Sequence, residues 1–111
     1  MKTITFIADD YEYLIELERR YLENNSYQTI IAHLMETHKT DPLFLKSPIW
    51  EAYMLEFQSN LHFYEMEKKS FGLYIENKLV NEYNVDPSQL QNWSWEIVDF
   101  SFKEILVSFQ E

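Results

Sequence analysis

Two histidine–glutamate pairs have the residue types and spacing that could bind a metal. His33 and Glu36 are three residues apart, and so are His62 and Glu65. Such a pair lies on one face of a helix, and carboxylate-bridged dimetal proteins place Glu and Glu-x-x-His groups inside a helical bundle. Here the order is reversed, and two helices would supply only half of such a site. A dimetal oxidase-like centre would therefore need a homodimer, and the simpler interpretation is two solvated helix faces without a metal.

Composition argues against most other catalytic chemistry. The chain has no cysteine, which excludes disulfides, thiol nucleophiles, zinc ribbons and iron–sulfur ligation. It has one glycine, Gly72, whereas phosphate-cradling loops need two or more. No Gly-x-Ser-x-Gly sequence is present. We therefore expect a protein that is not an enzyme and carries no cofactor.

The charge of the chain indicates which class of partner it does not bind. Its 111 residues include 19 acidic and 9 basic side chains, a formal charge of −10. This charge repels the phosphate backbone, so direct binding of nucleic acid is not expected. It favours either solubility or attraction to a basic surface on another protein. No apolar run is long enough for a membrane span, and Asp9-Asp10 come too early for a secretory signal, so we expect a cytoplasmic protein.

Aromatic residues with acidic neighbours are the strongest candidates for a binding surface. The chain has three Trp, eight Tyr and eight Phe, and several fall outside the expected helical stripes. Tyr and Trp outside a core are typical interface anchors. We expect a protein or peptide, basic in character, to bind a face formed by Asp10, Tyr11, Tyr13, Glu16, Trp93, Trp95, Glu96 and Asp99.

The first third of the chain predicts a strand and then a long helix. Residues 2–7 alternate in part and are rich in β-branched side chains, which is typical of a short strand. Residues 9–38 show helical spacing, with Asp9 or Asp10 as the cap. Asn24-Asn25-Ser26 interrupts this pattern, so two helices with a turn are the alternative. We favour one helix because no proline or glycine enforces a break.

The middle of the chain predicts a second helix. Asp41-Pro42 would end the first helix and start a short turn over 43–45. Ser47-Pro48 would then start a helix over 49–82 with a near-heptad apolar stripe. Gly72 lies inside this helix at a cost of about 1 kcal/mol relative to alanine, which close packing or a bend would explain. Two long helices with a short connection should form an antiparallel hairpin.

The last third predicts a second strand pair. Asp86-Pro87 would start a short turn through Leu90, and residues 93–100 and 104–109 are strand-like, although no Asn-Gly or Asp-Gly turn joins them. With residues 2–7 they would form a small antiparallel sheet. We therefore predict one α+β domain over 1–111, a helical hairpin with this sheet. The alternative is an all-helical bundle with an extended C-terminal arm.

The chain also resembles a family of small helical accessory proteins. Leu17-Glu18-Arg19-Arg20 before an apolar helical run, the acidic helix pair, and the closing Trp93–Phe100 segment are similar to proteins encoded beside radical enzymes that modify Cys-repeat peptides. The resemblance implies a non-catalytic subunit that supports the enzyme or holds its peptide. It implies no catalytic residue.

Together these patterns favour a non-enzymatic protein-interaction module, an accessory or adaptor subunit. The alternative is an acidic inhibitor, such as an immunity or anti-defence protein, that mimics nucleic acid and blocks the basic cleft of a nuclease. A homodimer is compatible with both.

Overall fold

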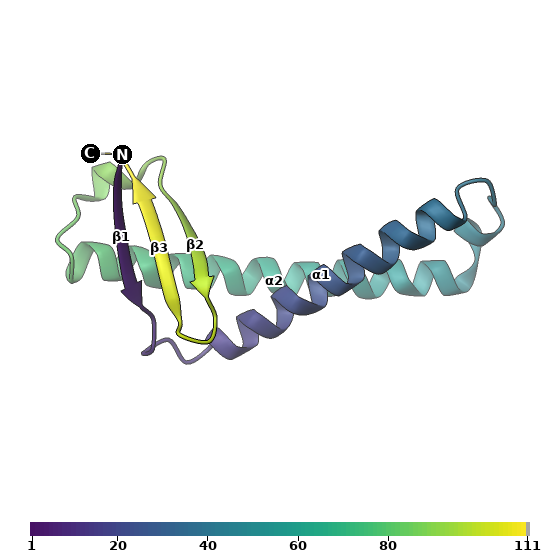
Figure 1. Ribbon diagram of the computed structural model, residues 1–111, viewed down its shortest axis with the longest axis horizontal. Coiled ribbons are helices and arrows are strands. Elements are labelled where there is room, and N and C mark those ends of the chain that lie inside the picture. Colours follow the sequence, from purple (N-terminus) through teal and green to yellow (C-terminus); the bar gives the residue numbers. More distant parts are fainter. Residues whose placement is uncertain (111) are drawn as a thin grey trace. The chain divides into compact units, whose positions relative to one another are not determined.

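The computed structural model describes residues 1–110 and leaves Glu111 outside the described part. The elements follow in the order β1 (Lys2–Ile7), α1 (Leu14–Thr37), the 3-10 turn η1 (Phe44–Lys46), α2 (Pro48–Asn81), the 3-10 turn η2 (Pro87–Leu90), β2 (Ser94–Asp99) and β3 (Glu104–Phe109) (Figure 1). This is the predicted α+β fold of a helical hairpin with an antiparallel sheet from the two ends of the chain. No helix of the described residues is both long and apolar enough to cross a membrane.

The chain divides into two compact units. The first consists of residues 1–15 and 68–111, and the second consists of residues 16–67. The first unit therefore contains the sheet and the end of α2, whereas the second contains nearly all of α1 and the beginning of α2.

In the first unit, β3 is the central strand and β1 and β2 are its antiparallel neighbours. Lys2 pairs with Phe109, so the start of the chain lies beside the end of β3. Side chains alternate between the sheet faces, and the inner face carries the fully buried Ile105 and Val107 of β3. Phe71, Ile75 and Leu79 of α2 are also fully buried. This sheet-on-helix layer is the main core of the protein.

The first helix is continuous, as predicted, but it begins later than predicted. It passes through Asn24-Asn25-Ser26 without a break. It begins at Leu14 instead of residue 9, because the segment before it forms turns in which the Tyr11 backbone N–H donates to the Ala8 carbonyl. Asp10 does not act as the predicted cap, since its carboxylate accepts hydrogen bonds from Tyr74 and Lys78.

The starts of α2 and η2 follow the predicted capping chemistry. Ser47 lies one residue before the start of α2, and its Oγ accepts a hydrogen bond from the backbone N–H of Trp50. Asp86 caps η2 through a capping box with Gln89, with Pro87 as the first residue of the turn. The turn η1 differs from the prediction, because it begins one residue later and its N-cap is Leu43, which makes no side-chain cap, instead of Asp41. The Asp41 carboxylate accepts a hydrogen bond from the Phe44 N–H.

Of the two reasons predicted for a glycine inside α2, the structure shows close packing at Gly72. A Cβ at this position would lie 3.4 Å from Trp95 Nε1, so the indole of β2 packs directly over the helix backbone.

The β2–β3 connection closes without the turn residues expected of a tight hairpin. Asp99 Oδ1 accepts hydrogen bonds from the backbone N–H groups of Ser101 and Phe102. Lys103 has φ of 56°, in the left-handed region that costs a side-chain-bearing residue about 1–2 kcal/mol. This strained position ends the turn, one residue before β3 begins.

Replacing this residue by glycine should stabilise the protein. We expect Lys103→Gly to raise the free energy of unfolding by about 1 kcal/mol, because glycine adopts positive φ readily. Urea unfolding followed by circular dichroism measures the change. The control Lys103→Ala removes the same side chain but keeps the Cβ, and a gain as large as that of glycine would rule out backbone strain as the cause.

Candidate functional site

The eight residues predicted to bind a partner are divided between the two units. Seven lie in the first unit, and Glu16 lies in the second. Asp10, Tyr13 and Glu96 are exposed. The other five are half-buried: Tyr11, Glu16, Trp93, Trp95 and Asp99.

Within β2, the predicted residues lie on opposite faces of the sheet. Trp95 packs edge-on against Phe71 with ring centroids 5.1 Å apart, so its indole belongs to the core layer. Glu96 is exposed and pairs in register with Leu106. Adjacent residues of a strand point in opposite directions. A single partner surface on this unit therefore cannot use both side chains.

Tyr11 belongs to an aromatic cluster on α2. Its ring lies 4.8 Å from the Phe71 ring and 4.9 Å from the Tyr74 ring, and Tyr13 contacts its edge at 5.9 Å. Tilted and edge-on pairs at these distances contribute about 0.5–1.5 kcal/mol each. The segment before α1 is thereby fixed on the end of α2, and Tyr13 remains the exposed member.

Asp10, Tyr74 and Lys78 form the most chemically suggestive cluster. The Tyr74 hydroxyl and the Lys78 ammonium both donate to the Asp10 carboxylate, and Glu82 lies 3.5 Å from Lys78 Nζ. The hydrogen bond from Tyr74, with a smaller effect of Lys78, lowers the pKa of Asp10. Burial and the hydrogen bond to Asp10 raise the pKa of Tyr74 to about 12. Burial of Lys78 opposes its charge, but its hydrogen bonds to Tyr74 and Asp10 outweigh this effect and raise its pKa.

These shifts favour an ion pair over proton transfer at neutral pH. Tyr74 stays protonated, Lys78 stays charged and Asp10 stays a carboxylate, whereas a general acid or base works best with a pKa near the working pH. The cluster therefore joins the loop before α1 to α2.

Removing the Asp10 charge should destabilise the protein in a pH-dependent way. We expect Asp10→Asn to lower the free energy of unfolding by about 1 kcal/mol at pH 7, because Lys78 is only 12% exposed and loses its main counter-charge. A carboxyl with a lowered pKa in the folded state stabilises above its unfolded value of 3.8 and loses this contribution as pH falls through the folded value. The difference between variant and parent should therefore vanish in acid.

Thermal unfolding between pH 7 and pH 2 measures this effect. Asp9→Asn is the matched control, since it removes the same charge from the exposed neighbouring residue. An equal loss of stability in both variants would contradict the ion pair as the source of the effect.

The histidine–glutamate pairs are exposed. His33, Glu36, His62 and Glu65 all lie on the surface of the second unit. Among residues 1–110, no group of three or more His, Asp or Glu side chains is close enough to hold a metal ion.

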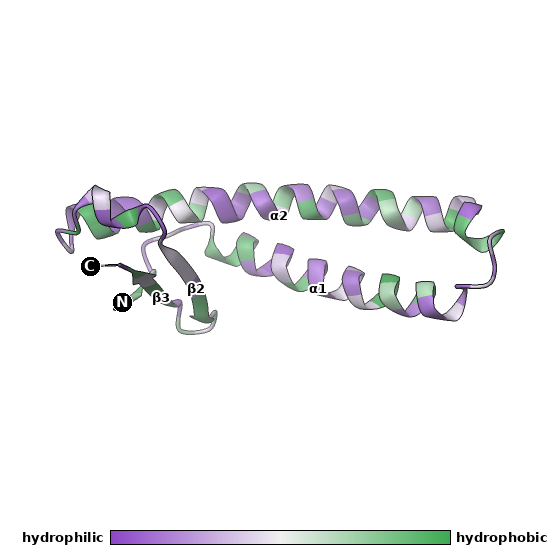
Figure 2. Cartoon of the chain, turned by 90° about the horizontal axis from the view of Figure 1, so that it is seen from above, coloured by the Kyte–Doolittle hydropathy of each residue, from purple (hydrophilic) through white to green (hydrophobic). Residues whose placement is uncertain are grey.

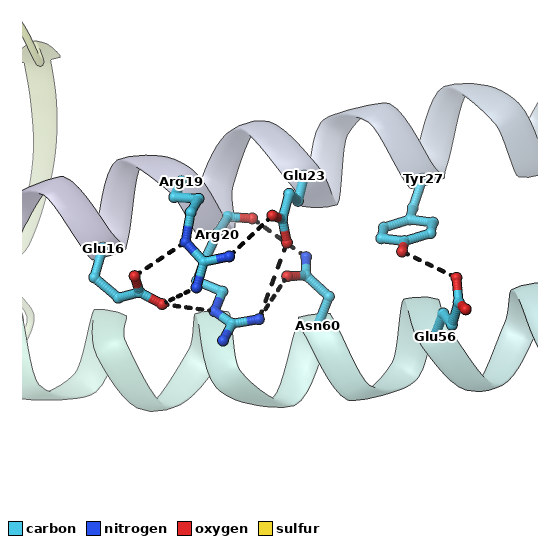
Figure 3. Close-up of polar contacts among 7 residues, drawn as sticks. All are labelled: Glu16, Arg19, Arg20, Glu23, Tyr27, Glu56 and Asn60. Atoms are coloured by element: carbon cyan, nitrogen blue, oxygen red, sulfur yellow. Dashed lines mark hydrogen bonds and ion pairs between the residues drawn. The ribbon is translucent and has the colours of Figure 1, made fainter.

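The helices of the second unit contact each other through polar side chains (Figure 3). Arg19 and Arg20 of α1 form ion pairs with Glu16 and Glu23 on the same helix. The Arg19 hydrogen bond lowers the pKa of Glu16. Across the hairpin, Arg20 donates to the buried Asn60 of α2, and the Asn60 amide donates to the Arg20 carbonyl. The two-way contact fixes the register of the helices.

A groove lies beside this contact and was not predicted from the sequence. Its volume is about 470 Å³. We call it the hairpin groove, lined by Leu22, Glu23, Ser26, Tyr27, Ile30, Tyr53 and Glu56. Tyr27 of α1 and Glu56 of α2 both line it, and the Tyr27 hydroxyl donates to Glu56 Oε2 at 3.2 Å (Figure 3). The sequence signal that could have indicated it is the four-residue spacing of Leu22, Ser26 and Ile30.

No protein-family model matches the chain, and no curated protein or solved structure matches it either.

Proposed function

We propose that the chain is a non-enzymatic protein-interaction module, an accessory or adaptor subunit that binds a basic partner protein through an acidic and aromatic surface of its helical hairpin. The observation that carries the proposal is the small core of the second unit. Within residues 16–67, all of them described, two hydrophobic residues are buried, Leu17 and Ile31, and ten large ones are exposed.

This pattern is that of helices that lack one more packing layer. A helix buries its apolar stripe against another element, and the hairpin leaves apolar residues exposed on both helices. Leu22 and Ile30 of α1 and Leu55, Phe63 and Met66 of α2 are among the exposed side chains. Figure 2 shows hydrophobic residues recurring along the length of both helices. Exposed apolar side chains that gather in one place mark protein–protein contacts, and Leu22 and Ile30 line the same groove.

The charge of the hairpin supports a basic partner. Residues 16–67 contain nine acidic and four basic side chains, and opposite charges across an interface speed and orient association. Compared with the face first predicted near the chain ends, the hairpin offers the more accessible surface, since Trp95 and Tyr11 pack within the first unit.

Affinity capture with the full chain tests this proposal. We expect the immobilised protein to retain one partner from an extract of its host in a stable stoichiometric complex at 150 mM salt. Leu22→Asp should abolish this retention, because it puts a charge on the apolar surface. Val98→Asp is the matched control on the sheet, since the two side chains are equally exposed, at 54% and 53%.

Three results would contradict the proposal. No retained partner, together with turnover of a metabolite by the purified protein, would indicate an enzyme. Equal loss in both variants would move the contact away from the hairpin. A fall in affinity of about 1,000-fold between 50 and 200 mM salt would indicate a nucleic-acid mimic instead of an apolar interface.

A further inference from the structure

We propose that the hairpin groove receives a basic amphipathic helix of the partner, with apolar side chains between Leu22 and Ile30 and a Lys or Arg against Glu56. This inference rests on the proposed function and specifies the partner's chemistry.

The α1 side of the groove has the form of a helix-packing surface. Leu22, Ser26 and Ile30 succeed one another at intervals of four residues, so they form one ridge along the helix. Ser26 is small and exposed, and it leaves room between two larger apolar side chains that are 54% and 39% exposed. The ridge covers two helical turns, about 12 Å at 1.5 Å per residue. A third helix packing along α1 and α2 would fill this space with side chains from successive turns.

The α2 side supplies the charge. Tyr53 is half-buried and Glu56 is exposed at the groove. Among the described residues, no ion pair involves Glu56, whereas Glu23 at the other wall is paired with Arg19 and Arg20. The groove therefore has one carboxylate already compensated and one that is available to a cation from outside.

Tyr27 holds that carboxylate in place. Its hydroxyl donates to Glu56, and burial, followed by this hydrogen bond, raises the pKa of Tyr27. The phenol thus remains a donor throughout the physiological range. A carboxylate held in a groove that Leu22 and Ile30 also line suits a Lys or Arg whose aliphatic stem lies on apolar surface while its charged group reaches the carboxylate.

Charge also argues against a second copy of the chain as the occupant. Another hairpin would bring nine further acidic side chains against four basic ones toward the same carboxylate. Like charges facing each other in an interface reduce affinity. The complementary occupant is a segment with the opposite charge.

A designed peptide tests this without knowledge of the natural partner. The probe is a fluorescein-labelled 18-residue peptide of Leu and Lys arranged as an amphipathic helix, titrated with the full chain by fluorescence anisotropy at 150 mM salt. We expect saturable binding, weakened about threefold to fivefold by Glu56→Gln and at least tenfold by Ile30→Asp. Glu51→Gln is the matched control, because Glu51 is an exposed carboxylate on α2 that does not line the groove. It should change affinity by less than twofold.

Several outcomes would overturn the inference. Equal weakening by Glu56→Gln and Glu51→Gln would indicate diffuse attraction to net charge. Equal binding of a Leu–Glu peptide of the same length would remove the requirement for a cation. Sedimentation as a dimer that Ile30→Asp dissociates would assign the groove to a second copy. The circular dichroism spectrum of each variant must match that of the parent, which shows that the variant is folded. Ser26→Leu fills the groove without adding charge, so it should also weaken peptide binding.

The natural partner separates this inference from the proposed function. If the Ile30→Asp and Glu56→Gln variants both still capture the partner from the host extract, the groove is not the contact, although the chain still binds a partner. If no partner is retained at all while the peptide binds as expected, the groove chemistry stands and the accessory function fails.

Discussion

Two helices that pack only on each other can bury one stripe each, and this limit explains most of the second unit. A third layer would cover the remaining apolar side chains, but residues 16–67 contain two helices and a short turn. The hairpin is held by polar contacts such as the pair Arg20–Asn60 and by aromatic contacts such as Tyr21–Tyr64, with Asn24 also buried in it. The stability of the hairpin therefore depends on the register between α1 and α2, while its apolar surface stays accessible. This combination suits a subunit that binds a partner.

The first unit meets the same requirement by adding a sheet. The end of α2 buries Phe71, Ile75 and Leu79, and β3 supplies Ile105 and Val107 from the inner face of the sheet. Since β1 and β3 come from opposite ends of the chain, the core forms only when both ends pair. The Tyr11 cluster and the Asp10 ion pair then fix the segment before α1 to α2.

Local patterns predicted the elements, but contacts between distant residues decided the details. Helical spacing, Ser47-Pro48 and Asp86-Pro87 were sufficient for the two long helices and η2. The start of α1 could not be predicted, because Asp10 binds Tyr74 and Lys78, more than sixty residues later. The hairpin groove depends on the register between α1 and α2, which no local pattern determines. Strand alternation alone already placed Trp95 and Glu96 on opposite faces, a signal the sequence contained.

Mapping the peptide on the chain by nuclear magnetic resonance tests the central claim most directly. Backbone amide shifts of the full protein would be recorded during titration with the Leu–Lys peptide. We expect the largest changes at residues 22–30 and 53–56 of the hairpin and small changes in β2 and β3. Changes centred on Tyr13, Trp93 and Glu96, or spread evenly over the acidic surface, would contradict it.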